Sequence, residues 1–234
     1  GTGTTDTARV RGGDAQNDST YVLVSSGGRS DSALIRVGPL TALCTGGTAR
    51  SGTITTSQTW TRAASPHCVG GALLIQAATL TIEAGATVKF AAGATIDVGA
   101  CCNAGQSGRI RANGTGALPI LFTSLDTDPR PGQWGGIRTH WVSANDSLIF
   151  RNVVMEYGGG GLGLSDIPAG DLRYGTIGHV NTCQGTILLD AVTLRESRLY
   201  GVATACALTM TNSVITQAYC AGVISTGGDT RVTG

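Results

Sequence analysis

The chain has 234 residues, with 16 basic and 15 acidic side chains and a formal net charge of +1. This balance gives no basic footprint for nucleic acid, and no run reaches the roughly 18 apolar residues that a membrane span needs. Glycine accounts for 36 residues and aromatic residues for only 5%. This composition suits short strands joined by tight corners and suits helices badly. We therefore expect an all-β protein with neither a nucleic-acid partner nor membrane insertion.

Residues 1–45 differ from the rest and are predicted to form a separate N-terminal β element. Two strands, 21–25 and 33–37, flank a glycine-containing loop, which is a hairpin signal. The stretch TYVLVSSGGRSDSALIRV is similar to the last two strands of an immunoglobulin-like domain. Because two strands cannot bury a core alone, we expect either a cap on the main body or the remnant of an upstream module. The start, with neither Met nor a charged leader, predicts a processed product or a fragment of a larger protein.

The main body, 46–234, is organised around three eight-residue units that run from 75 to 98. Thr79, Thr87 and Thr95 take the same place in each unit, and the second and third units begin with an Ala-Gly-Ala corner. Alternating apolar residues within each unit indicate a short strand. Three such strands make one coil of a right-handed parallel β-helix of about 20–24 residues, with coils about 4.8 Å apart. The alternative is an antiparallel meander, whose hairpins favour Asn-Gly or Asp-Gly loops instead.

Later segments extend this pattern. Residues 186–202 and 207–223 match at an offset of about 21, which predicts two successive coils. Residues 148–150 and 153–155 are predicted to pair around Asn152, and a glycine-rich loop insertion is expected at 158–176.

The strings TLTIEAGATVKFAAGATIDV, GRIRANGTGALPILFTS, PGQWGGIR and VVMEYGG resemble right-handed parallel β-helix segments of secreted and surface-anchored bacterial proteins. These proteins share the pectate-lyase type of fold, and the resemblance covers roughly residues 51–224. It implies the fold and says little about function, because lyases, hydrolases, adhesins and stalks all use this fold.

The seven cysteines favour an oxidising compartment, hence a secreted or cell-surface protein. A metal site is not favoured, because there is no CxxC and the three histidines have no spaced partners. Cys44 and Cys68, like Cys183 and Cys206, are about one coil apart, so both pairs are candidate disulfides between coils. The alternative is that buried cysteines merely fill the interior. Since seven is odd, Cys220 is the candidate thiol for another subunit.

Few residues suggest chemistry, and we assign no catalytic residue. Asp126 and Asp128 are a weak Ca²⁺ candidate, because Asp-x-Asp before proline is more typical of a solvated turn. Residues 195–198 are expected to be a solvated corner. The side chains that could stack on a sugar ring, with core packing as the alternative, are Trp134, Trp141 and Tyr157.

The sequence favours a non-catalytic structural or adhesive solenoid. No capping helix is visible after 223, so unpaired strand edges predict end-to-end self-association into a stalk or fibre, or a cell-surface or matrix partner. The alternative is a module that binds or degrades polysaccharide. Its groove would lie between loops 125–134 and 158–176, with Asp126, Asp128 and Asp171 as acids. Apart from Ca²⁺, no cofactor is expected.

Overall fold

The computed structural model describes residues 19–26, 29–36, 44–99, 107–140, 145, 147–160, 175–179 and 184–234, with 19–36 and 179 described by backbone alone. The chain divides into two compact units, Gly1–Thr45 and Gly46–Gly234. In the first unit, β1 (Ser19–Ser26) pairs antiparallel with β2 (Arg29–Arg36). The hairpin prediction is confirmed, but the strands extend into the residues that were predicted to form the loop. Pairing continues to Ser26 opposite Arg29, because polar side chains do not prevent backbone pairing.

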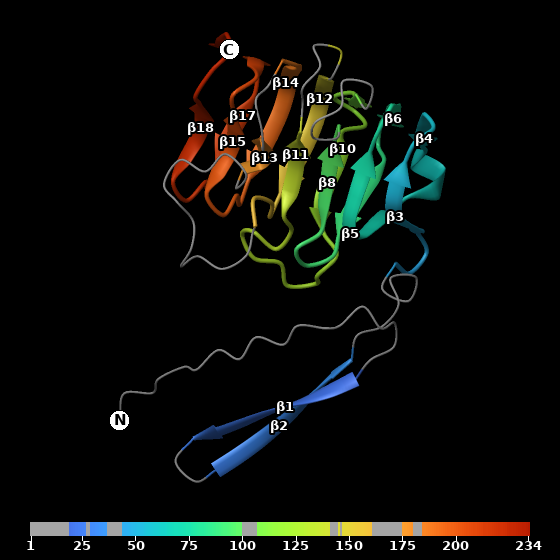
Figure 1. The fold of residues 1–234 in the computed structure, drawn as a ribbon, viewed down its shortest axis with the longest axis vertical. Helices are drawn as coiled ribbons and strands as arrows, with labels where there is room; N and C mark the ends of the chain where they lie inside the picture. The colour runs from blue at the N-terminus through green and yellow to red at the C-terminus, as the bar shows by residue number, and fades with distance from the viewer. Residues whose placement is uncertain are drawn as a thin grey trace. The chain divides into compact units, whose positions relative to one another are not determined.

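The second unit is a right-handed parallel β-helix, in which 17 strands form one sheet by pairing in parallel with strands of neighbouring coils (Figure 1). A single short 3-10 helix, η1 (Arg62–Ala64), occurs among the described residues of this unit. The strands are β3 (Thr48–Ile54), β4 (Gln58–Trp60), β5 (His67–Ile75), β6 (Ala78–Ile82), β7 (Thr87–Phe90), β8 (Thr95–Val98), β9 (Gly108–Asn113), β10 (Ile120–Ser124), β11 (Gly136–Thr139), β12 (Ser147–Glu156), β13 (Gly175–His179), β14 (Thr186–Arg195), β15 (Tyr200–Thr204), β16 (Ala207–Thr211), β17 (Val214–Thr216), β18 (Ala221–Ser225) and β19 (Thr230–Thr233).

The strands lie on three faces, which the chain visits in the order A, B, C. Face A stacks β4, β6, β9, residues 147–151 of β12, residues 186–190 of β14, β16 and β19. Face B stacks residues 48–50, residues 67–69, β7, β10, residues 153–156, residues 193–195 and β17. Face C stacks residues 52–54, residues 72–75, β8, β11, β13, β15 and β18.

The eight-residue units predicted from the sequence each supply one face. β6, β7 and β8 carry Thr79, Thr87 and Thr95 onto faces A, B and C. Gly85 and Gly93 in the Ala-Gly-Ala corners have φ values of 76° and 73°, a conformation that glycine adopts without steric cost. The corner prediction and the coil prediction are therefore confirmed together.

The corner between faces A and B can be a single residue in the left-handed conformation. Asn152 (φ 46°), Ala191 (φ 52°) and Asn212 (φ 49°) occupy it in three coils. The prediction that 148–150 pairs with 153–155 is wrong, because both stretches belong to β12 and lie on adjacent faces. In a solenoid each stretch pairs with the coils before and after it, not with its neighbour in sequence.

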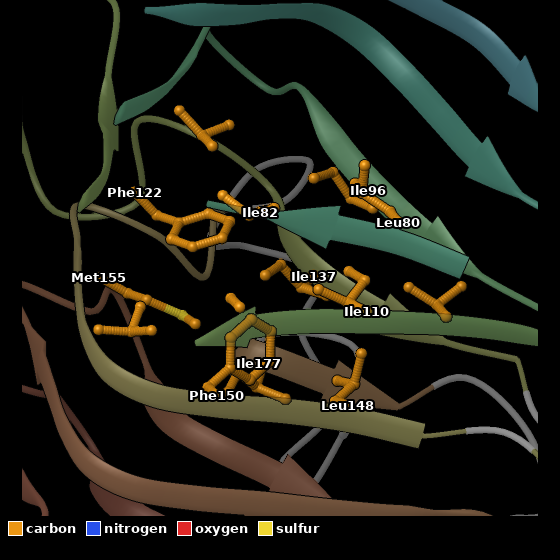
Figure 2. Packing of buried hydrophobic residues seen from close by; sticks show 14 of the residues in the cluster. Leu80, Ile82, Ile96, Ile110, Phe122, Ile137, Leu148, Phe150, Met155 and Ile177 are labelled. Carbon is orange, nitrogen blue, oxygen red and sulfur yellow. The ribbon is translucent and has the colours of Figure 1, made fainter. Parts of the chain in front are cut away.

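The core fills the interior of the three-faced coil. Figure 2 shows side chains from all three faces, among them Leu80, Phe122 and Ile137, directed to the same interior. Residues bonded across simple coils are 21 or 22 positions apart, which confirms the predicted coil of 20–24 residues. In the middle coils, inserted loops raise these separations to between 33 and 43 positions.

Candidate functional site

The predicted Ca²⁺ ligands lie in the loop between β10 and β11. Asp126 Oδ1 accepts a hydrogen bond from the Asp128 N–H at 3.1 Å, and Asp126 Oδ2 accepts one from Gln133 Nε2 at 3.1 Å. Both oxygens of Asp126 therefore stabilise the turn itself. Within the described residues, no group of three or more His, Cys, Asp or Glu is placed to hold a metal ion. Calcium binding here stays a prediction.

The predicted sugar-stacking residues have different environments. Trp134 is fully buried, stacks on Phe90 with ring centroids 4.0 Å apart, and donates from Nε1 to the Glu156 carbonyl at 2.8 Å. A glycan contact through Trp134 is therefore wrong, because the loop returns this ring to the core. Tyr157 is partly buried against the same core. Trp141 and Asp171 lie outside the described residues.

Three of the cysteines are disulfide-bonded: Cys44, Cys68 and Cys206. Cys183 lies outside the described residues, so the predicted pairings stay predictions. The residue of β3 that lies beside Cys68 is Ala49. Cys44 precedes β3 in the chain. Of the cysteines within the described part of the chain, Cys220 is free, and it is exposed.

A polar cluster that sequence reasoning missed lies on the outer side of face C. Asp97 is on β8, between Ile96 and Val98, whose side chains point inward. Its Oδ1 is 2.9 Å from His140 Nε2, and its Oδ2 accepts a hydrogen bond from Thr95 Oγ1 at 2.8 Å. The side chains of His140 and Asp97 are 21% and 17% exposed. The pair therefore lies at the surface but is largely shielded from water.

Arg138 completes this cluster, because it lies beside Asp97 in the register of β8 and β11. Burial would raise the pKa of Asp97, but hydrogen bonds from His140 and Thr95, together with the charges of His140 and Arg138, outweigh it. The pKa of Asp97 is lowered, so its carboxylate is ionised at neutral pH. Arg138 Nε is buried and has no hydrogen-bond partner among the described residues. A carboxylate that orients an imidazole beside a guanidinium is an arrangement capable of acid–base chemistry.

A second cluster joins three coils on face B. Glu156, which is 9% exposed, accepts hydrogen bonds from Thr123 Oγ1 at 2.8 Å and from Arg195 Nε at 2.8 Å. Arg195 Nη2 lies 2.6 Å from Glu156 Oε2, the oxygen that also accepts from Arg195 Nε. The expectation of a solvated corner at residues 195–198 is wrong for Ser197, which is 1% exposed. The Arg195 side chain is 49% exposed while it pairs with Glu156. Neither cluster has a sequence signal, because its members come from different coils.

The three faces, the parallel register and the continuous interior define a parallel β-helix protein. Residues 52–159 match the family model of the pectate-lyase like beta helix domain, which agrees with the resemblance drawn from the sequence. Comparisons with curated proteins and with solved structures give no match. Among the described residues, no helix has the length and apolar character to cross a membrane.

Proposed function

We propose that this chain is a structural and adhesive β-helix module of a secreted or cell-surface protein, which associates end to end. The observation that carries the proposal is the use of outer polar side chains between coils. Glu156 binds Thr123 and Arg195 on the coils before and after it. Asp97 binds His140, and Asp190 Oδ1 accepts from Thr211 Oγ1 at 2.8 Å one coil away. Charged side chains that bond between coils in this way stabilise the stack of coils.

The cysteines support the extracellular location. Cys44, Cys68 and Cys206 are disulfide-bonded, and disulfides persist in oxidising environments and are rare in reducing ones. A cross-linked solenoid resists local opening, because a disulfide restricts the unfolded chain. This property suits a scaffold exposed to solvent outside the cell.

The test combines an activity screen with a binding screen. The purified chain is assayed for lyase and hydrolase turnover on a polysaccharide panel, with and without Ca²⁺, and for binding to intact cells and extracellular matrix. We expect surface or matrix binding without turnover. Turnover that Asp97→Asn abolishes while the circular dichroism spectrum is unchanged would overturn the structural role.

A carbohydrate-active role is the second candidate, and the Asp97–His140 pair beside Arg138 favours it. Asp97 would orient the His140 imidazole. The Arg138 guanidinium, whose Nε has no hydrogen-bond partner within the described part of the chain, would bind an anionic or hydroxyl group of a sugar. This candidate predicts that Asp97→Asn and His140→Gln each reduce turnover at least tenfold. Asp190→Asn, on face A, serves as the matched control with unchanged turnover.

A further inference from the structure

The outer side of face A carries a surplus of positive charge. The charged residues on the strands of this face are four arginines and one acid: Arg109, Arg111, Arg151, Arg231 and Asp190. These residues alternate along their strands with residues that point to the interior, so their own side chains point outward. The whole chain has a net charge of only +1. The surplus is therefore a property of this face and not of the chain as a whole.

Three of the arginines lie on two neighbouring strands. Arg109 and Arg111 are two positions apart on β9, which places them about 6.6 Å apart along the strand, and Arg151 lies on β12 beside Asn113. Arg109 Nε donates to the Asn145 carbonyl at 2.7 Å, and Arg151 Nη1 donates to Asn113 Oδ1 at 3.1 Å. Among the described residues, no acidic side chain forms an ion pair with Arg109 or Arg111. These guanidinium groups therefore keep donors that an anionic ligand can use.

One row of outward side chains crosses face A from coil to coil. From β6 to β19 the row contains, in register, Thr81, Arg111, Ile149, Leu188, Thr209 and Arg231. Arg111 and Arg231 are exposed, and their strands are four steps apart in the sheet, which is about 19 Å. Ile149 and Leu188 lie between them and are half-buried. A line of cations separated by apolar side chains suits an extended polymer better than a compact ligand.

We propose that the outer side of face A binds a linear glycan that carries sulfate groups. Guanidinium groups stay charged at physiological pH and donate paired hydrogen bonds to oxyanions. A sulfate group has three terminal oxygens and can accept from two guanidinium groups at once, which the neighbouring Arg109 and Arg111 provide. A carboxylate has two oxygens, which a single guanidinium fork satisfies. Ile149 and Leu188 offer apolar surface to the nonpolar face of a sugar ring.

Other partners fit this face less well. The aromatic residues on the strands of face A, Trp60 and Phe150, are fully buried, so its described outer side has no ring for the base stacking that single-stranded nucleic acid needs. An apolar protein surface would have to desolvate the arginines without pairing them. The proposal rests on the proposed adhesive role and names the chemistry of the partner in that role.

The test measures binding of the purified chain to polyanions by isothermal titration calorimetry. The probes are heparin, chemically desulfated heparin, polygalacturonate and a single-stranded oligodeoxythymidine of similar charge. We expect heparin to bind and each of the other probes to bind at least tenfold more weakly.

Variants of the arginine row locate the binding surface. Arg111→Gln and Arg231→Gln should each weaken heparin binding at least threefold. Arg111→Lys, which keeps the charge but loses the paired donors, should weaken it at least twofold. Arg130→Gln removes an exposed arginine from the loop between β10 and β11 and is the matched control, with unchanged binding. An unchanged circular dichroism spectrum shows that each variant is folded.

A chain that does not bind heparin overturns the proposal. Equal binding of desulfated heparin, polygalacturonate or the oligonucleotide overturns it as well, because sulfate is then not what is recognised. An equal effect of Arg130→Gln and Arg111→Gln shows that face A is not the binding surface. The proposed adhesive role has a separate readout, binding to intact cells and matrix. If that binding survives Arg111→Gln and the removal of sulfate from the matrix, the adhesive role stands while the glycan proposal fails.

Discussion

Asp97 and His140 lie 43 positions apart in the chain, yet Asp97 Oδ1 and His140 Nε2 are 2.9 Å apart. β8 and β11 pair in parallel, with Arg138 beside Asp97 and Thr139 beside Val98. His140 directly follows Thr139 and therefore lies close to Asp97. Thr95 Oγ1 binds the second carboxylate oxygen at 2.8 Å. One carboxylate therefore connects two coils across a long loop insertion.

Removal of the Asp97 charge tests this connection. The pKa of Asp97 is lowered from the ordinary value of 3.8, so the folded state binds the proton less readily than the unfolded state. The stabilising contribution is present above pH 3.8 and is lost as the pH falls through the lower folded pKa. We expect Asp97→Asn to lower the free energy of unfolding by about 1–3 kcal/mol at neutral pH, as measured by urea denaturation.

The same variant should differ little from the wild type well below the folded pKa of Asp97. Asp229→Asn, at an exposed residue that directly precedes β19, is the matched control and should leave the neutral-pH midpoint unchanged. An undiminished difference at strongly acid pH would mean that packing, not ionisation, explains the effect.

Glu156 and Arg195 are expected to be energetically coupled. Glu156 is 9% exposed, so Arg195→Ala leaves a nearly buried carboxylate with no counter-charge, whereas the double variant with Glu156→Gln does not. We expect a coupling energy of about 1–2 kcal/mol in a double-mutant cycle measured by chemical denaturation. Arg111→Ala, which removes an exposed arginine of face A, should show no coupling to Glu156→Gln. Additive effects of Glu156→Gln and Arg195→Ala would contradict the arrangement.

His67 should make the first coil sensitive to acid. Its Nε2 lies 2.8 Å from the Thr61 carbonyl, which can only accept, so Nε2 carries the proton and Nδ1 accepts from Arg50. Burial lowers the pKa of His67 from 6.5; the Thr61 hydrogen bond opposes this shift and the Arg50 charge adds to it. Below pH 6.5 the unfolded state therefore binds a proton that the folded state does not, so stability falls with falling pH until the folded pKa is reached.

The measurement for His67 is the slope of the unfolding free energy against pH. His67→Phe keeps an aromatic ring against Trp60, whose ring centroid is 5.1 Å from that of His67. This variant should flatten the slope just below pH 6.5, whatever its absolute stability. An equal slope in wild type and variant would show that other groups carry the acid sensitivity.

Ala191 occupies a strained corner position that a substitution should relieve. Its φ is 52°, in the corner column that Asn152 and Asn212 occupy in neighbouring coils. Residues with a Cβ atom disfavour this conformation, and asparagine and glycine tolerate it. We expect Ala191→Asn to raise the free energy of unfolding by about 0.5–1 kcal/mol. Ala207→Asn, at a strand position on β16, is the control and should lower it; a lower stability for Ala191→Asn would contradict the assignment.

The fold was predictable because its signals are local. The alternation within 75–98 shows which side chains point inward, and Gly85 and Gly93 mark corners that need a left-handed conformation. The match of 186–202 to 207–223 shows the coil length, which the pairing of Val202 with Val223 confirms. The same reasoning went wrong at β12, where Asn152 bends one strand across two faces. A corner of one residue barely interrupts the alternation of apolar and polar residues, so it is difficult to recognise in the sequence.

The sequence by itself determined the class of architecture and the length of a simple coil, and it singled out Cys220 as a candidate thiol, which is free among the described cysteines. Only the tertiary structure decided that Asp97 binds His140, that Arg195 pairs with Glu156 and that Trp134 is buried. The physical reason is that inward and outward alternation has a period of two residues and can be read locally. Which outward-facing residues become neighbours depends instead on the register between coils. The length of each inserted loop sets this register, and it can be read only from the folded chain.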